Sequence, residues 1–243
     1  MSAVANRPRA PATPDVAPSV RLTESTRVEA FSDAVMAIVI TILVLELRVP
    51  HHEPGRLLAA LESMWGSLLA FLISFLRVSV IWLNHHGLFV RVRRVDRTLL
   101  WLNLGLLLNC TIIPLPTAIL ADALRGGDPG DLRVAAMLYA LTAALQSAAW
   151  IPIFPYLRDH PELAEPGHSP AYLHAQRIRP WIGTGISVGA ALAALVSPVA
   201  MLVLWTLSLI FLAATSDGVE AGHVIARWGS RRRKSGAPGA SRA

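Results

Sequence analysis

A group of polar residues stands at the start of the first long apolar run of the chain. Phe31, Ser32 and Asp33 come directly before residues 34–45, which carry no charge, and Arg27 lies six positions before the aspartate. An aspartate inside a bilayer needs a partner, because at a helix centre its insertion costs roughly 2.5–3.5 kcal/mol. Six residues is not a same-face spacing, so a pair with Arg27 requires a later helix start or a bridging helix. Ser32 and Asp33 also suit a helix N-cap, and a capped helix start at the membrane surface is the alternative interpretation.

The apolar run that follows carries a regular stripe. Ala34, Ile38, Thr41 and Leu45 are separated by four, three and four residues, so they share one face of a helix. That face is apolar apart from one hydroxyl. From the residues alone, contact with lipid or with another helix explains it, with Thr41 bonding back to the carbonyl of residue 37.

Residues 82–89 are rich in hydrogen-bonding side chains and follow the second apolar run. Asn84, His85 and His86 occur there, and paired histidines can bind metal or titrate near neutral pH. Adjacent residues on a helix point about 100° apart, so joint ligation is poorly placed, and packing with hydrogen bonding is the expected role. Arg77 lies inside the second apolar run, where it either pairs with a polar group or extends to the membrane surface.

Signatures of enzymes do not stand out in this sequence. It has no glycine-rich phosphate loop and no HExxH, and its single cysteine, Cys110, falls in an apolar run. We therefore expect no catalytic residues, no metal site and no cofactor. Gly185 and Gly189 form a small-xxx-small pair, which predicts a close contact between helices.

The composition places these residues in a membrane protein. Of 243 residues, 53% are apolar and only 16% are charged, with a mean hydropathy of +0.49, whereas soluble domains have roughly 25% charged residues. The apolar blocks are about 20 residues long, the length of helix that crosses a bilayer. The predicted fold class is an all-α membrane protein with six transmembrane helices per chain. The predicted spans are approximately residues 30–49, 57–82, 98–121, 132–154, 180–196 and 199–215, and Ser197-Pro198 joins the last two as a tight hairpin.

Charges between the predicted spans indicate the topology. Arginines concentrate in both terminal segments, around residues 91–97 and between 158 and 179, while the opposite loops hold fewer of them beside several aspartates. The positive-inside rule therefore places both ends of the chain in the cytoplasm. We interpret the net charge of +6 as this signal, so nucleic acid is not an expected partner. We predict a disordered cytoplasmic tail at 1–26, a six-span domain at 27–216 and a basic cytoplasmic tail at 217–243.

Several of these residues together resemble a known family of membrane proteins. They are Arg27-x-x-x-Phe31-Ser32-Asp33 with Ala37-Ile38 and Thr41 after it, Trp82-x-Asn84-His85-His86-x-x-Phe89, Asn103, and Pro114-x-Pro116-Thr117. The pattern is similar to that of the transmembrane protein 175 family, over about residues 27–215. Its members are potassium-permeable channels of lysosomes, with shorter prokaryotic relatives. Leu115 departs from the family pattern, where an aromatic residue is expected.

The resemblance implies an assembly with a central pore. One six-span repeat implies a homotetramer in the inner (plasma) membrane, with the lipid bilayer and its own copies as partners and potassium as the permeant ion. The first helix of each subunit is then expected to line the pore. Ile38 would form a hydrophobic constriction that expels water, Thr41 a hydroxyl layer for a passing monovalent cation, and Leu45 a further apolar ring. The sequence has no Thr-Val-Gly-Tyr-Gly loop, so the potassium preference should be modest.

The resemblance also implies a role for the polar residues around the first helix. Arg27, Phe31, Ser32 and Asp33, with Asn84 and His85 from the second motif, would form a network that fastens this helix to its neighbours on the cytoplasmic side.

Two other functions compete with a potassium-preferring channel. One is a secondary transporter or proton pathway that uses Asp33, Arg77 and the histidines, although transporters usually show broken helices and polar groups near the midplane. The other is a non-conducting membrane scaffold whose basic C-terminal tail binds anionic lipid.

Overall fold

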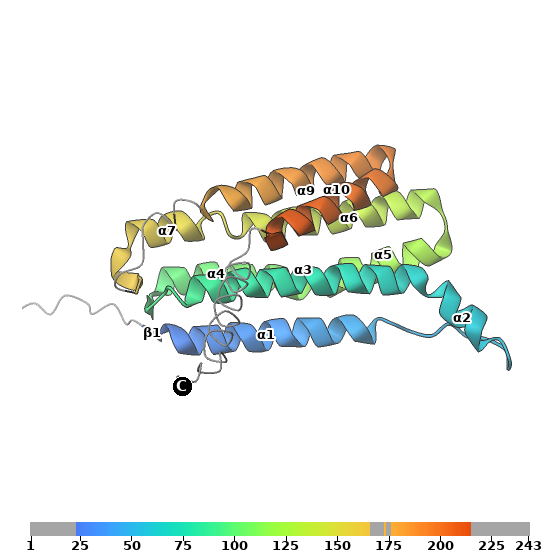
Figure 1. The fold of residues 1–243 in the computed structure, drawn as a ribbon, viewed down its shortest axis with the longest axis horizontal. Helices are drawn as coiled ribbons and strands as arrows, with labels where there is room; N and C mark the ends of the chain where they lie inside the picture. The colour runs from blue at the N-terminus through green and yellow to red at the C-terminus, as the bar shows by residue number, and fades with distance from the viewer. Residues whose placement is uncertain (1–22, 166–172, 174–175, 215–243) are drawn as a thin grey trace, which may run out of the picture.

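The chain is a bundle of long helices that run side by side (Figure 1). The computed structural model describes residues 23–165, 173 and 176–214. Its helices are α1 (Ser25–Leu45), α2 (Leu57–Ser63), α3 (Trp65–Phe89), α4 (Arg97–Ile112), α5 (Pro114–Gly126), α6 (Pro129–Ala148), α7 (Ile153–Asp159), α9 (Ile178–Val196) and α10 (Pro198–Ala214). A short 3-10 helix, Pro161–Leu163, and two short strands, β1 (Thr23–Glu24) and β2 (Arg94–Val95), complete the described elements.

Five helical segments of the described chain are long and apolar enough to cross a bilayer. They are Ser25–Leu45, Trp65–Phe89, Arg97–Gly126, Pro129–Asp159 and Ile178–Val196. A shorter apolar helix over Ala200–Ala214 follows the last of them. This agrees with a multi-pass all-α membrane protein and with the expected hairpin at Ser197-Pro198. In Figure 1, β1 and α7 lie at one end of the bundle, and α2 and the α9–α10 turn lie at the other.

The first helix begins earlier than predicted. It starts at Ser25, inside the predicted disordered tail, and its N-cap is Glu24 rather than Ser32 or Asp33. The residues before it form antiparallel pairs with β2, Thr23 with Val95 and Glu24 with Arg94. The N-cap interpretation of Ser32 and Asp33 is therefore wrong, since both lie two turns inside the helix. Residues 1–22 and 215–243, which include most of the predicted tails, lie outside the described residues.

Three other predicted spans are divided or extended by local chemistry. The second becomes α2 and α3, which meet at Met64, and α3 continues to Phe89. The third breaks at Ile113, because Pro114 lacks an N–H to continue the helix ladder. Its second half ends at Gly127, whose φ of 71° lies in the left-handed region that glycine adopts without strain. The fourth begins at Pro129, and Asp128 is its N-cap, because the Asp128 carboxylate accepts hydrogen bonds from two backbone N–H groups of the first turn.

Two apolar clusters hold the bundle together. One joins α1, α3, α4 and α7 through large side chains such as Met36, Leu43 and Leu106. The other joins α6 to α9 and α10 and is rich in alanine, with Ala140 and Ala194 fully buried. Small residues allow helix backbones to approach closely, so van der Waals contact can hold helices together in lipid.

The predicted contact at Gly185 and Gly189 is not made within the described chain. A Cβ at either position would meet no atom within 4 Å. Gly183 is the close-packed glycine of α9, where a Cβ would lie 3.1 Å from the Ser147 hydroxyl.

Candidate functional site: the first helix and its anchor

The first helix has one packed face and one unpacked face. Its buried residues are Val28, Ser32, Met36, Val39 and Leu43. The predicted stripe lies on the other side, and Ala34, Ile38, Thr41 and Leu45 are all exposed in the single chain. Only 28% of this span is buried, compared with 33–50% of the other four. The stripe is therefore free to contact lipid or another subunit.

Thr41 is the hydroxyl on this stripe. Its Oγ1 donates to the carbonyl of Ile38 at 2.8 Å, one residue closer than the carbonyl of residue 37 that we expected. A hydroxyl oxygen has two lone pairs, so donation into the helix leaves acceptor capacity at the exposed surface. This oxygen can contact a cation, whereas the side chains of Ile38 and Leu45 on either side have no oxygen atom.

Two polar contacts link the first three turns of α1 to the last part of α3. Trp82 Nε1 donates to Asp33 Oδ1 at 2.9 Å, and His86 Nδ1 lies 2.9 Å from Glu29 Oε1. Glu29 and Asp33 are four residues apart on α1, and Trp82 and His86 are four residues apart on α3. Each pair therefore lies on one face of its helix, and the two faces meet. The rings of Trp82 and His86 also stack, with centroids 5.7 Å apart. The carboxylate of Asp33 is thus satisfied by a neighbouring helix.

A third link is fully buried and involves α4. Asn103 Nδ2 donates to Ser32 Oγ at 2.9 Å, and Ser32 Oγ donates to the Val28 carbonyl at 2.8 Å. Asn103 Oδ1 lies 2.9 Å from His85 Nε2. An amide oxygen only accepts, so this bond requires the proton on Nε2. Ser32, Asn103 and His85 are each at most 1% exposed. We call these links, Glu29–His86, Asp33–Trp82 and Ser32–Asn103–His85, the anchor.

The structure brings together only some of the predicted network. Ser32, Asp33 and His85 belong to the anchor, but Arg27 is exposed and forms no ion pair with Asp33. Phe31 is 53% exposed. Asn84 faces elsewhere, since its Nδ2 donates to the Val80 carbonyl and it lines a cavity on the other side of α3. In the single chain, these three side chains therefore lie outside the anchor, and their part in the predicted network stays a prediction.

Sequence reasoning missed the roles of Glu29, Trp82 and His86. The signal was available in principle, because Glu29 and Asp33 are spaced by four residues, as are Trp82 and His86. Using it would have required the register of α1 against α3.

A separate polar cluster joins α3 to α5 and α6. Ser74 Oγ lies 2.7 Å from Thr117 Oγ1 and 2.8 Å from the Tyr139 hydroxyl. Thr117 Oγ1 also donates to the Ile113 carbonyl at 2.7 Å. All three side chains are buried, and their hydrogen bonds hold α3, α5 and α6 together.

Residues that suggest catalysis or metal binding do not form such sites. Residues 185–189 read GISVG and match GxSxG, but they lie inside α9 and not on the strand-to-helix turn that exposes a nucleophile. In the described part of the chain, no three His, Cys, Asp or Glu side chains gather as a metal site requires. The polar groups around α1 act on each other and position a helix.

Comparison with known proteins agrees with this arrangement. Residues 27–114 match the family described as endosomal/lysosomal potassium channel TMEM175. A potassium channel of Streptomyces collinus is 38% identical over 182 residues, which cover 74% of this chain and 87% of that protein. The human endosomal/lysosomal proton channel TMEM175 is 35% identical over 137 residues, which cover 51% of this chain and 27% of that protein.

A solved structure shares the fold over most of its length. The crystal structure of a lysosomal potassium-selective channel TMEM175 homologue from Chamaesiphon minutus superposes with a TM-score of 0.70 and 33% identity. The match covers 79% of this chain and 98% of that one. With one relative matched over 87% of its length, this chain belongs to the TMEM175 family of ion channels, which are not enzymes.

Proposed function

We propose that this chain is a potassium-preferring cation channel, in which four copies surround a pore lined by α1. The observation that carries the proposal is the unpacked stripe on α1, apolar except for Thr41, in the span with the smallest buried share. Relatives named as potassium channels in two bacteria support the choice of ion.

The stripe supplies the parts of a pore in order along the helix. At roughly 1.5 Å per residue, Thr41 lies about 4.5 Å beyond Ile38, and Leu45 about 6 Å further. Four Ile38 side chains around one axis make a ring apolar enough to expel water. Four Thr41 hydroxyls replace part of the hydration shell of a cation, and because they are neutral they bind it weakly enough to release it.

The anchor fits this arrangement, because it holds one end of each α1 while leaving the stripe uncovered. Among the described residues, more arginines lie at or near the ends of the spans at the anchor end than at the other end. The anchor end has Arg27, Arg91, Arg93, Arg94, Arg97, Arg158, Arg177 and Arg179, and the other end has Arg48, Arg56, Arg125 and Arg133. By the positive-inside rule, the anchor end faces the cytoplasm. The bacterial relatives named as potassium channels support the plasma membrane as the location.

The test is a planar-bilayer recording of the purified chain with potassium on one side and sodium on the other. Thr41→Val removes the hydroxyl but keeps the shape of the side chain, so the reversal potential should move toward zero as potassium preference falls. Thr111→Val is the matched control, because Thr111 is exposed on α4 and donates at 2.8 Å to the carbonyl three residues earlier, as Thr41 does.

Ile38→Asn tests the constriction in the same recording. A polar ring holds water, so the variant should conduct more readily than the parent chain. Leu108→Asn is its control on α4, where Leu108 is 61% exposed. If all four variants conduct as the parent does, α1 does not line the pore. Slow, saturable flux without current steps would instead support a transporter, and no flux at all would support a scaffold.

A further inference from the structure

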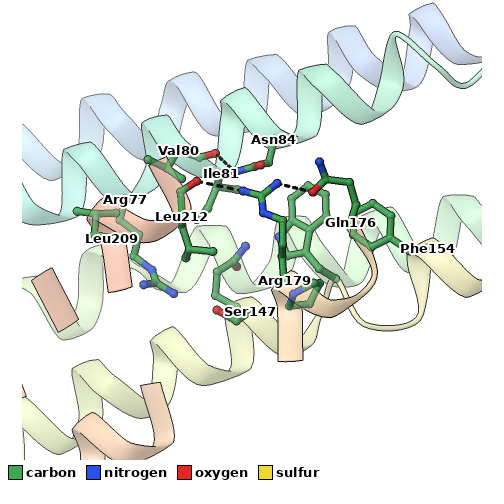
Figure 2. Close-up of a pocket in the computed structure, with 13 residues that line it drawn as sticks. Arg77, Val80, Ile81, Asn84, Ser147, Phe154, Gln176, Arg179, Leu209 and Leu212 are labelled. Atoms are coloured by element: carbon green, nitrogen blue, oxygen red, sulfur yellow. Dashed lines mark hydrogen bonds between the residues drawn. The ribbon is translucent and has the colours of Figure 1, made fainter. Parts of the chain in front are cut away.

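A narrow cavity lies among α3, α6, α7, α9 and α10 (Figure 2). Its volume is about 60 Å³, or about 550 Å³ when all the unfilled space out to its open mouth is included. The cavity is therefore a slot and not a wide chamber. Apolar side chains form most of its wall, among them Val80, Ile81, Trp150 and Leu209. This slot is unrelated to the stripe on α1.

A buried arginine, Arg77, lines part of the slot. Arg77 is 6% exposed and lies twelve residues before the end of α3, about 18 Å along the axis at roughly 1.5 Å per residue. Its Nη2 donates to the Ala143 carbonyl at 2.8 Å, and its guanidinium lies 5.4 Å from the centre of the Trp205 ring. Among the described residues, no carboxylate forms an ion pair with it. A guanidinium has five N–H donors, and the hydrogen bond to Ala143 uses one of them within the described chain.

A second unused donor lines the same slot. Gln146 is 1% exposed, and its Nε2 has no hydrogen-bond partner among residues 23–165, 173 and 176–214. Its Oε1 is contacted by the Cys110 thiol at 3.8 Å, so the amide N–H₂ group is the part left unsatisfied. Leaving a buried donor without an acceptor costs about 1–3 kcal/mol. Arg77 bonds to the Ala143 carbonyl, three residues before Gln146 on α6, and both side chains line the same cavity. A guanidinium and an amide N–H₂ group form a site of donors, which an oxyanion satisfies.

The rest of the lining agrees with an anionic ligand. None of the lining residues in the described chain is acidic. Arg179 adds a second positive charge, and it donates to Gln176 Oε1 at 2.5 Å and to the Leu212 carbonyl at 3.0 Å, as Figure 2 shows. The bond to Leu212 ties the start of α9 to the end of α10. The apolar wall near Arg77 and Arg179 suits a hydrocarbon chain better than a fully hydrated ion.

We propose that this slot binds an anionic amphiphile of the membrane, with its carboxylate or phosphate oxyanion on Arg77 and Gln146 and its hydrocarbon along the apolar wall. The oxyanion would neutralise the Arg77 charge at membrane depth and accept from the unpaired amide. Binding of this ligand would hold α3, α6 and α10 together around one head group.

The experiment is photolabelling of the purified full chain in neutral detergent. The probe is palmitate that carries a diazirine on its chain, and the matched probe is the methyl ester of the same molecule, which has no charge. The site of labelling is mapped by mass spectrometry of peptides. The charged probe should label the slot-lining segments of α3, α6 and α10, and the ester should label them at least about tenfold less, because charge-assisted hydrogen bonds contribute roughly 1.5–3 kcal/mol.

Variants show whether labelling depends on Arg77 in the slot or on positive charge elsewhere on the protein. Arg77→Gln should lower labelling by the charged probe to the level of the ester. Arg125→Gln is the control and should change nothing, since Arg125 pairs with Asp122 on the surface of α5. If Arg77→Gln does not fold, Gln146→Leu provides the test, because it removes the unpaired donors and adds apolar contact. Labelling unchanged in these variants, or equal labelling by acid and ester, would overturn the proposal.

A second arm distinguishes a lipid from a free ion. Thermal unfolding of the chain is followed with inorganic phosphate and, separately, with palmitate at the same concentration. Stabilisation by palmitate alone supports the membrane source. Equal stabilisation by phosphate, lost in Arg77→Gln, would show a site for small free anions and would overturn the amphiphile.

Discussion

Asn103 offers the sharpest test of the anchor, because its one amide group joins two helices. It donates to Ser32 and accepts from His85 Nε2, and all three side chains are at most 1% exposed. Asn103→Leu keeps nearly the same size but removes both bonds. His85 Nε2–H then has no acceptor, which costs about 1–3 kcal/mol, and Ser32 loses a bond worth about 0.5–1.5 kcal/mol. We expect a loss of about 2–4 kcal/mol in the free energy of unfolding.

The double variant Asn103→Leu with His85→Phe tests whether the loss of stability comes from the unpaired His85 N–H. Replacing both partners of a buried hydrogen bond by apolar groups of similar shape can be nearly neutral. The phenylalanine would also keep the stacking on Phe89, whose ring centroid lies 4.3 Å from that of His85. We therefore expect the double variant to be more stable than the sum of the two single changes by about 1–2 kcal/mol.

Unfolding in a denaturing detergent, followed by circular dichroism, measures these values. With a shift of roughly 2–4 °C per kcal/mol for a chain of this size, Asn103→Leu should lower Tm by about 5–15 °C. Asn109→Leu is the matched control, because the hydrogen bond that the Asn109 amide makes in the described chain stays within its own helix, to the Gly105 carbonyl at 2.8 Å. Strict additivity of the two changes, or an equal loss in the control, would refute the buried link.

Two further predictions concern packing and the exposed part of the anchor. Gly66→Ala places a Cβ 2.8 Å from the Cβ of Leu124 and should lower the free energy of unfolding by about 1–3 kcal/mol. Gly185→Ala meets nothing within 4 Å and should raise the free energy of unfolding by up to about 1 kcal/mol through helix propensity. Equal effects of the two variants in thermal unfolding would contradict this prediction. Trp82→Phe removes the donor to Asp33 and should cost about 1 kcal/mol, while Asp33→Asn keeps an acceptor and should cost less than half of that, in the same measurement.

The sequence was most informative where apolar length decides the structure. Blocks of about 20 apolar residues predicted the long helices, and the Ser197-Pro198 pair predicted the hairpin between α9 and α10. The start of α1 was misplaced, because residues 25–33 are polar enough to suggest a tail. They are helical in the fold, where Glu29, Ser32 and Asp33 find hydrogen-bond partners on α3 and α4. Such partners come from other helices and leave no local signal.

Adjacent residues of one motif show the same limit. Asn84 and His85 were both expected to hold α1, but one helical step turns a side chain by about 100°. His85 consequently reaches Asn103 on α4, while Asn84 lines the slot on the other side of α3. The motif identifies which residues matter, and the rotation of α3 decides which neighbour each one meets.

The position of the anchor along α1 has a consequence for the proposed pore. Its last link is at Asp33, and beyond it α1 is held in the described chain by apolar contacts at Met36, Val39 and Leu43. Such contacts have no preferred direction, so they permit small rotations and shifts that hydrogen bonds would resist. Ile38 lies five residues, about 7.5 Å, beyond the last link. The helix can therefore pivot about the anchor, which would change the width of the proposed constriction while the anchored end stays in place. Thr41 is three residues beyond Ile38 on the same helix, so the proposed hydroxyl layer would move with it.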